Sequence, residues 1–398
     1  MKRILLYSSG IIAEKKPTGG ELRFLELAAA LREQKDAELC CADEEAELQA
    51  TGLRAAFHMK GPDGTPTFLP EEGRILLANR KTLKKIADSD YASVIVFDVP
   101  PAIGLTLYRV RNLVLMIRKD LIGYERVKSS GNALAKRIKI LYQWICEDLC
   151  LRNAKQIICQ CAYDRDVLIG RHPLIGKKLM SKFAIQINNC NPAWIVRRAA
   201  EADTENSPET AAERDKETEV EATNGKRFRI GFVGGFDDLR KGQELFLKAA
   251  AYLTGRYPEM DFLLVGGGRR LEEYRRQYET ERIRFYGRME NPLSVMKRCD
   301  LLAVPSLADS CPNTVMEALY MGIPVIGSRA GGIPEILRDE DALFSTDWMS
   351  LAEKIETCRE NPLFLSHLRD AQRARKEELT FDWAEKILEL ISGDAEQE

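Results

Sequence analysis

The sequence has few of the residues from which metal sites are built, and it lacks the long apolar runs of membrane proteins. Only three histidines occur in 398 residues, and none of them lies in a recognisable catalytic string. No run approaches the eighteen or so apolar residues that a membrane span requires. The sequence therefore predicts no transmembrane helix. It also has few histidines from which a metal site or a catalytic triad could be built.

A paired cysteine pattern and a secretory signal are also missing. The basic start is followed by an apolar stretch of only about five residues before Ser8, with no small-residue cleavage site, which favours a first buried strand. Ten cysteines are present, and we expect them to be reduced, mostly buried thiols of a cytosolic protein. Their closest spacings match no paired set of zinc ligands: Cys40–Cys41, Cys146–Cys150 and Cys159–Cys161.

The net charge of −2 hides a difference between the two halves of the chain. Residues 1–199 hold 32 Lys and Arg against 22 Asp and Glu, whereas residues 200–398 hold 27 against 39. Solvated surfaces and chance explain such a difference. The functional alternative is that the N-terminal half meets an anionic partner such as a lipid phosphate or a membrane surface. We expect no nucleic-acid partner.

Apolar, strand-like runs alternate with helical patterns through both halves, which is typical of parallel sheets covered by helices. A chain of this length favours two domains. The runs that predict strands are 3–9, 93–99, 112–118, 156–161 and 182–188 in the first half, and 228–235, 261–268, 282–287, 300–306 and 323–328 in the second.

Residues 199–226 separate the two halves and contain scarcely any large apolar side chain. Such a segment cannot bury enough surface to offset its ordering entropy, so we expect an exposed, disordered linker or insertion. The expected domains are therefore 1–198 and 227–380. The amphipathic last segment, 381–398, could pack back on either of them, and the N-terminal domain is our expectation.

The stretch Leu301–Glu335 reads as strand, loop, helix, strand and Gly-rich turn. If the helix starts near Asn313, the unpaired N–H groups of Asn313, Thr314 and Val315 and the positive end of the helix dipole form an anion site. Glu317, one turn in, can then accept two ribose hydroxyls, and Asp309 can accept hydroxyls of a sugar beyond the phosphates. Taken alone, either acid is more simply a dipole-balancing or turn residue.

The whole string resembles the donor-site motif of the retaining GT-B glycosyltransferases of family 4. In that motif an acid, seven residues and a glutamate precede Gly-x-Pro-Val and Gly-Gly-x-Pro-Glu. The chain departs from it at Asp309, where glutamate is more usual. The matching residues are Asp309, Glu317, Gly322, Pro324, Val325, Gly331, Gly332, Pro334 and Glu335. The resemblance implies two Rossmann-like parallel-sheet domains facing a central cleft, and a nucleotide diphosphate-sugar donor.

The resemblance extends upstream and assigns further donor contacts. Lys241 matches the family's diphosphate-binding lysine, and Arg240 beside it is the candidate for the arginine, since Gly235 occupies that position. Gly287 and Arg288, after a later strand, should border the nucleobase. Without the resemblance, basic residues near a helix start are more often solvated. The three glycines at 266–268 do not complete a dinucleotide fingerprint, because the pattern fails at Leu271.

The N-terminal half resembles the family less sharply. Gly19 and Gly20 before the first helix can let a substrate phosphate or sugar approach the backbone. Where many relatives have a histidine that faces the transferred sugar, this chain has Arg118 and Asp120; a surface salt bridge is an equally good interpretation. In 126–152, basic residues near a helix start accompany an apolar stripe, which we interpret as core packing, with membrane-surface docking as the alternative.

Taken together, these patterns predict a retaining glycosyltransferase that needs no metal and no cofactor. Lys241, Arg240 and Asp309 would act in catalysis. The donor would be a UDP- or GDP-sugar and the acceptor a glycan or lipid-linked molecule, at or near the cytoplasmic face of a membrane. The remaining alternatives are a sugar phosphorylase or epimerase on the same fold, and a catalytically silent nucleotide-sugar binding module.

Overall fold

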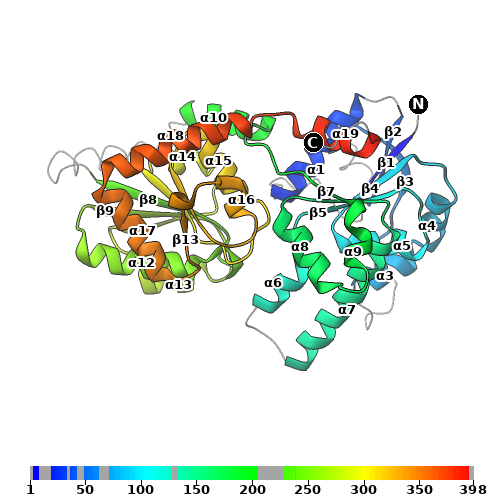
Figure 1. The fold of residues 1–398 in the computed structure, drawn as a ribbon, viewed down its shortest axis with the longest axis horizontal. Helices are drawn as coiled ribbons and strands as arrows, with labels where there is room; N and C mark the ends of the chain where they lie inside the picture. Colours follow the sequence, from blue (N-terminus) through cyan, green and yellow to red (C-terminus); the bar gives the residue numbers. More distant parts are fainter. Residues whose placement is uncertain are drawn as a thin grey trace. The chain divides into compact units, whose positions relative to one another are not determined.

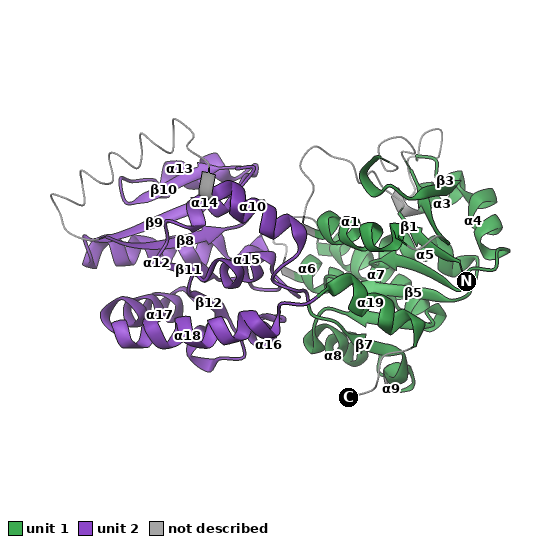
Figure 2. Ribbon diagram, turned by 90° about the horizontal axis from the view of Figure 1, so that it is seen from above, with its two compact units in different colours: residues 1–187, 382–398 green, residues 188–381 purple. Residues whose placement is uncertain are grey.

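The computed structural model describes residues 3–8, 19–33, 36–42, 49–61, 71–127, 133–204, 227–237 and 239–393. The chain divides into two compact units (Figure 2). Unit 1 comprises Met1–Ile187 and Asp382–Glu398, and unit 2 comprises Asn188–Phe381. The division therefore falls eleven residues before the expected end of the first domain.

Unit 1 contains a seven-stranded parallel sheet in the order β3-β2-β1-β4-β5-β6-β7. Its central strands are buried along their whole length, as expected where helices cover both faces of a parallel sheet. The strands are β1 Ile4–Tyr7, β2 Ala37–Cys41, β3 Arg54–His58, β4 Ser93–Phe97, β5 Leu113–Ile117, β6 Gln156–Cys159 and β7 Phe183–Ile185. The five strands predicted for this half are confirmed, and β2 and β3 were missed.

Helices connect these strands (Figure 1). They are α1 Gly19–Arg32, α3 Glu71–Ala78, α4 Arg80–Ala87, α5 Val99–Leu107, α6 Leu121–Val127, α7 Ala133–Asn153, α8 Ala162–Arg171, α9 Gly176–Leu179 and the C-terminal α19 Trp383–Ser392. The last described helix, α19, belongs to unit 1. There the guanidinium carbon of Arg23 on α1 lies over the ring of Trp383, 5.6 Å from the ring centroid. Gln156 at the start of β6 also donates to the carbonyl of Leu390 on α19.

The apolar stripe of α7 is not part of the core. Its members are spaced to share one side of the helix, yet all of them are exposed to solvent. Ile138 is 60% exposed and Leu141 is 58% exposed, and Leu134, Ile145 and Leu149 are also exposed. The side that packs on unit 1 instead carries Cys146, Glu147 and Cys150. The core-packing interpretation of this stripe was therefore wrong.

Unit 2 contains a six-stranded parallel sheet in the order β10-β9-β8-β11-β12-β13. The five predicted strands are confirmed, and the two-residue β13 was missed. The strands are β8 Phe228–Val233, β9 Met260–Val265, β10 Ile283–Gly287, β11 Leu301–Val304, β12 Val325–Ser328 and β13 Leu343–Phe344. The helices are α10 Ala193–Thr204, α12 Gln243–Arg256, α13 Leu271–Tyr278, α14 Leu293–Met296, α15 Asn313–Met321, α16 Ile333–Leu337, α17 Trp348–Glu360 and α18 Pro362–Glu378.

Two features of unit 2 bear on the sequence-based boundaries. Helix α10 packs against α14 and α15, which is why the unit begins before the expected linker. Its last residues, 199–204, are helical although we predicted them to be part of that linker. The rest of the predicted linker, 205–226, lies outside the described residues. All ten cysteines are free and buried, which agrees with the part of the prediction that expected buried, unpaired thiols.

Candidate functional site

The order of strands in unit 2 places the switch point of its sheet between β8 and β11. The chain runs outward from β8 to β10 and then returns to form β11 on the other side of β8. In open α/β sheets, ligands bind beyond the carboxyl ends of the strands at such a switch point. The loops that follow β8 and β11 are also those that carry the predicted catalytic residues.

Lys241 and Asp309 meet at this switch point. Lys241 ends the 3-10 turn Leu239–Lys241 after β8, and Asp309 lies in the loop after β11. Their Nζ and Oδ2 atoms are 2.5 Å apart, and both side chains remain partly exposed. The structure therefore brings together two residues that lie 68 positions apart in the sequence. The lysine is held at the carboxyl edge of the sheet, with its charge balanced by a carboxylate.

Glycines allow the loops around this ion pair to come into contact. Gly242 has φ +70°, and a Cβ atom there would lie 1.9 Å from the carbonyl oxygen of Pro305. The loop of Leu307 is tied to the same turn, since its N–H donates to the carbonyl of Arg240 over 2.6 Å. Arg240 thus joins the loops after β8 and β11 through its backbone.

The Gly-Gly turn after β12 holds the backbone of Asp309 in a similar way. Gly331 has φ +57°, and a Cβ atom there would lie 2.1 Å from the carbonyl oxygen of Asp309. The N–H of Gly332 donates to that same oxygen over 2.9 Å. The position of the Asp309 carboxylate therefore depends on a residue without a side chain at 331.

Helix α15 begins at Asn313, as predicted, and its first turn lies against the end of β8. Thr314 Oγ1 is 3.4 Å from the carbonyl oxygen of Val233, the last residue of β8. The structure differs from our expectation at Val315, because its N–H donates to Pro312. Within the described residues, the N–H groups of Asn313 and Thr314 make no hydrogen bond, so these two donors remain at the positive end of the helix.

Glu317 is 5% exposed and lies one turn into α15. Its Oε1 is 4.0 Å from a terminal guanidinium nitrogen of Arg198 on α10. Arg198 is itself placed by its neighbours, because its carbonyl accepts from Asn291 and its guanidinium lies over the ring of Trp194. A buried carboxylate is costly without a nearby cation, and Arg198 supplies one. Sequence reasoning missed Arg198 because it assigned that segment to the N-terminal domain.

The loops after β9 and β10 complete the edge of the sheet. The N–H of Gly266 donates to the carbonyl of Gly287, and a Cβ atom at Gly266 would meet the carbonyl oxygen of Gly234. The Cβ of Arg288 lies 2.9 Å from the position that a Cβ of Gly267 would take. The predicted nucleobase-side residues Gly287 and Arg288 therefore lie against the glycine loop, which in turn lies against the loop after β8.

Unit 1 has its own switch point, between β1 and β4. Gly20 lies in the first turn of α1, which follows β1, and Arg118 follows β5. A Cβ atom at Gly20 would lie 2.5 Å from Nη1 of Arg118. Asp98, at the end of β4, accepts hydrogen bonds from the N–H of Arg118 and from its guanidinium. The structure thus places Gly20 and Arg118 together and adds Asp98, which the sequence did not single out.

Asp120 has a different environment from Arg118. Its Oδ1 accepts from the N–H of Gly123 at the start of α6 and from Arg171 over 2.6 Å. Arg171 also binds Glu147, which contacts the buried His172 over 2.8 Å. The carboxylate of Asp120 is therefore committed to a charged network inside unit 1.

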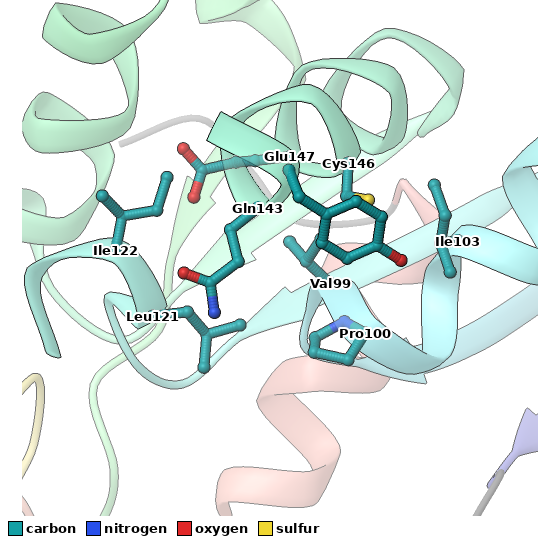
Figure 3. Close-up of a pocket in the computed structure, with 9 residues that line it drawn as sticks. Val99, Pro100, Ile103, Leu121, Ile122, Gln143, Cys146 and Glu147 are labelled. Atoms are coloured by element: carbon teal, nitrogen blue, oxygen red, sulfur yellow. The ribbon is translucent and has the colours of Figure 1, made fainter. Parts of the chain in front are cut away.

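A cavity in unit 1 lies between α5, α6 and α7 and is lined by Pro100, Ile122 and Gln143 among others (Figure 3). Its volume of about 30 Å³ is room for roughly two water molecules. The buried Oε1 of Gln143 has no hydrogen-bond partner and could accept from such a water. This cavity is too small to hold a nucleotide or a sugar.

The part of the chain that the structure describes contains neither a cluster of metal-binding side chains nor a membrane-spanning helix. There, no group of three or more His, Cys, Asp or Glu side chains is arranged to hold a metal ion. None of the helices described is both long and apolar enough to cross a membrane.

Comparison with known proteins places these features in context. Residues 227–361 match the family model described as "Glycosyl transferases group 1". A D-inositol 3-phosphate glycosyltransferase of Corynebacterium jeikeium is 33% identical over 118 residues, which cover 26% of this chain and 28% of the relative. A phosphatidyl-myo-inositol mannosyltransferase of Mycolicibacterium smegmatis is 31% identical over 116 residues, covering 28% of this chain and 30% of the relative. The matched segments thus span about a third or less of these relatives.

Solved structures match nearly the whole chain. The Anabaena protein HepE in complex with UDP and glucose superposes with a TM-score of 0.68 at 17% identity, over 98% of this chain and all of that one. The predicted fold class, two Rossmann-like parallel-sheet domains as in GT-B glycosyltransferases, is therefore confirmed.

The contact between Gly331 and Asp309 yields a stability prediction. Gly331→Ala should lower the free energy of unfolding by about 2 kcal/mol or more, because the new methyl group meets a backbone carbonyl at a positive φ. Gly255→Ala on α12 is the matched control, since its Cβ meets no atom within 4 Å, and it should stabilise by up to about 1 kcal/mol. Urea unfolding measures both; equal effects of the two substitutions would contradict the contact.

Proposed function

We propose that this protein is a glycosyltransferase that moves a sugar from a nucleotide diphosphate donor to an acceptor hydroxyl. The observation that carries this proposal is the Lys241–Asp309 pair, which lies at the switch point of unit 2 beside the first turn of α15. The match of residues 227–361 to the group 1 glycosyltransferases covers all of these residues and supports it.

Each part of the donor has a partner at this edge of the sheet. The free N–H groups of Asn313 and Thr314 and the ammonium of Lys241 would bind the diphosphate. The buried carboxylate of Glu317 would accept the ribose hydroxyls. Gly287 and Arg288 would border the base. The Anabaena protein HepE, which has the same fold, holds UDP and glucose, and this supports a nucleotide-sugar donor. We propose that the donor is a UDP- or GDP-sugar.

The Lys241–Asp309 pair suits a reaction in which negative charge grows on the leaving diphosphate. In the free protein the ammonium of Lys241 is already paired with Asp309. The lysine therefore interacts only partly with the diphosphate of the bound donor before the reaction begins. As the glycosidic bond breaks, the charge on the diphosphate oxygen increases and draws the lysine toward it, while Asp309 is released to the sugar hydroxyls. Arg240 beside the lysine adds positive charge. The positive charges of these two side chains then serve where other transferases use a metal ion.

We propose a front-face, retaining mechanism, in which the acceptor hydroxyl enters from the side on which the nucleoside diphosphate departs. Gly19, Gly20 and Arg118 are the acceptor-side candidates in unit 1, whereas the carboxylate of Asp120 is committed to Gly123 and Arg171. The names of two relatives include an inositol phosphate and a phosphatidylinositol, which supports a phosphorylated or lipid-linked acceptor. We place the reaction at the cytoplasmic face of a membrane.

Helix α7 supports the membrane part of this proposal. Five aliphatic side chains are exposed along one side of it, from Leu134 to Leu149, and a soluble protein rarely leaves such a stripe uncovered. The first two turns also carry Arg137, together with Lys136 and Lys139, whose ammonium groups contact the carbonyl of Arg126 and the carboxylate of Glu125 on α6. Apolar side chains beside basic ones are suited to an interface with anionic phospholipids, where the chains enter the acyl boundary and the cations meet headgroups. We therefore propose that α7 docks on an anionic membrane.

The role of Glu317 can be tested by binding. Glu317→Gln should weaken the binding of UDP or GDP at least tenfold, because hydrogen bonds to a carboxylate contribute about 1.5–3 kcal/mol each and the amide carries no charge. Calorimetry with both nucleotides measures the dissociation constants. Glu353→Gln on the exposed side of α17 is the control and should bind like the parent. If Glu317→Gln bound both nucleotides as tightly as the parent does, the proposed donor site would be contradicted.

The role of Lys241 can be tested by turnover. Lys241→Ala should lower kcat on the order of a hundredfold and affect donor affinity less, because the lysine meets charge that develops in the transition state. The assay is release of nucleoside diphosphate in the presence of EDTA, with Lys248→Ala on the exposed side of α12 as the control. Adding Asp309→Asn to Lys241→Ala shows whether an uncompensated carboxylate causes the loss. A parent-like kcat would exclude the lysine, and loss of parent activity in EDTA would exclude a metal-free mechanism.

Membrane docking predicts a change in vesicle binding alone. Leu141→Glu should reduce binding to vesicles rich in anionic phospholipid at least tenfold, because a charge enters the apolar side of the interface, while the unfolding temperature and UDP binding stay unchanged. Leu363→Glu on α18, also strongly exposed, is the control and should bind vesicles like the parent. Equal binding to neutral and anionic vesicles, or self-association abolished by Leu141→Glu, would contradict docking on an anionic membrane.

A further inference from the structure

Asp98 has a backbone conformation that an aspartate rarely adopts. Its φ is 66° and its ψ is 165°, a region occupied almost only by glycine. The residue is buried at the carboxyl end of β4, directly before α5. Because this conformation is costly and the acid is buried, the contacts of its side chain must account for its presence at the edge of the sheet.

Capping of the helix is not that reason. An aspartate before a helix ordinarily accepts from the N–H of the second or third helical residue. In α5 these residues are Pro100 and Pro101, which have no N–H, and Asp98 makes no side-chain cap bond. The carboxylate is therefore available to another element.

That element is the end of β5. Oδ1 of Asp98 accepts the N–H of Arg118 over 2.9 Å, and Oδ2 accepts its Nε and Nη2 over 3.2 and 2.7 Å. The guanidinium lies over the ring of Phe97, 4.9 Å from the centroid, and the ring of Phe24 on α1 packs against Phe97. One carboxylate thus fixes both the backbone and the head group of Arg118.

The opposite edge of the guanidinium is directed to the switch point of unit 1. Nη1 lies beside Gly20 in the first turn of α1, in a space that a side chain at position 20 would fill. Arg118 reaches this place from β5 across the end of β4, and its side chain is 23% exposed. Within the described residues, Nη1 makes no hydrogen bond. Asp120, two residues on, is paired with Arg171 and does not compete for it.

We propose that Asp98 is a positioning residue that holds Arg118 so that the Nη1 edge of the guanidinium binds an oxyanion group of a substrate. A planar guanidinium with one edge fixed by a carboxylate presents its other edge in a set direction, which suits a phosphate, carboxylate or sulfonate. The inference rests on the proposed transferase function, because that function supplies the substrates. It adds that one of them carries an acidic group besides any diphosphate held by unit 2.

The first test uses inorganic phosphate as the probe. The full-length protein is saturated with UDP, and its unfolding temperature is measured as phosphate replaces chloride at constant ionic strength. Phosphate should raise this temperature in the parent, and Arg118→Gln should abolish the shift. Lys119→Gln removes the same charge one residue away, on an exposed side chain, and should keep the shift.

The second test locates the acidic group. Dissociation constants are measured for UDP-glucose against UDP-glucuronate, and, with UDP bound, for glycerol against glycerol 3-phosphate. In the parent the charged member of one pair should bind more tightly, and Arg118→Gln should reduce that preference at least tenfold. A change in the first pair places the oxyanion on the donor sugar, and a change in the second places it on the acceptor. If the phosphate shift and both preferences are the same in Arg118→Gln as in the parent, the proposal is overturned.

Substitution of Asp98 separates positioning from structural support. Asp98→Gly suits the observed φ and ψ, so the relief of backbone strain offsets part of the stability lost with the ion pair, and it should reduce the same preference at least fivefold. Asp98→Asn should have an intermediate effect. A lower unfolding temperature with an unchanged preference would show that the pair only supports the fold. Failure of the parent to bind either UDP or GDP would instead refute the proposed function, and phosphate shifts measured without nucleotide keep the two outcomes distinct.

Discussion

The backbone contact between Asp309 and Gly331 constrains everything else at the edge of the second sheet. Because the turn after β12 lies against the carbonyl of Asp309, the path of the loop after β11 is restricted at this residue. That path brings the carboxylate of Asp309 to Lys241, and Gly242 allows the loop of the lysine to meet the same strand end. The ion pair is therefore a consequence of close backbone packing at positions where any side chain would collide.

The two units solve a similar problem in similar ways. In each sheet, an aspartate in or near the end of a strand at the switch point pairs with a basic residue from another loop: Asp309 with Lys241, and Asp98 with Arg118. In each unit a glycine leaves the space that is needed: Gly20 for the guanidinium of Arg118, and Gly242 for the loop of Lys241. The chemistry differs, since a lysine is a mobile point charge that can follow developing charge, whereas an arginine fixed by a carboxylate recognises a shape.

Much of the fold could be predicted because its signals are local. Buried parallel strands are continuous apolar runs, and α15 begins at the predicted residue because the sequence before it is a loop that ends in proline. Two of the three missed strands have weaker signals, because β13 has two residues and β3 is not fully buried on either side. The exposed stripe on α7 shows the limit of periodicity, which reveals that one side of a helix is apolar and not what covers it.

The candidate site was less predictable, because its unexpected members depend on contacts between distant segments. Asp98 precedes Val-Pro-Pro and reads as an ordinary turn residue; only the fold shows that the prolines leave its carboxylate to Arg118. Arg198 was missed because its helix follows the strands of the first half, yet it packs in unit 2 beside Glu317. In both cases an acid that looks isolated in the sequence lies next to a cation from a distant segment, and the fold brings the two together. The strain at Asp98, about 1–3 kcal/mol for such a conformation, is then best understood as the cost of holding that cation in one direction.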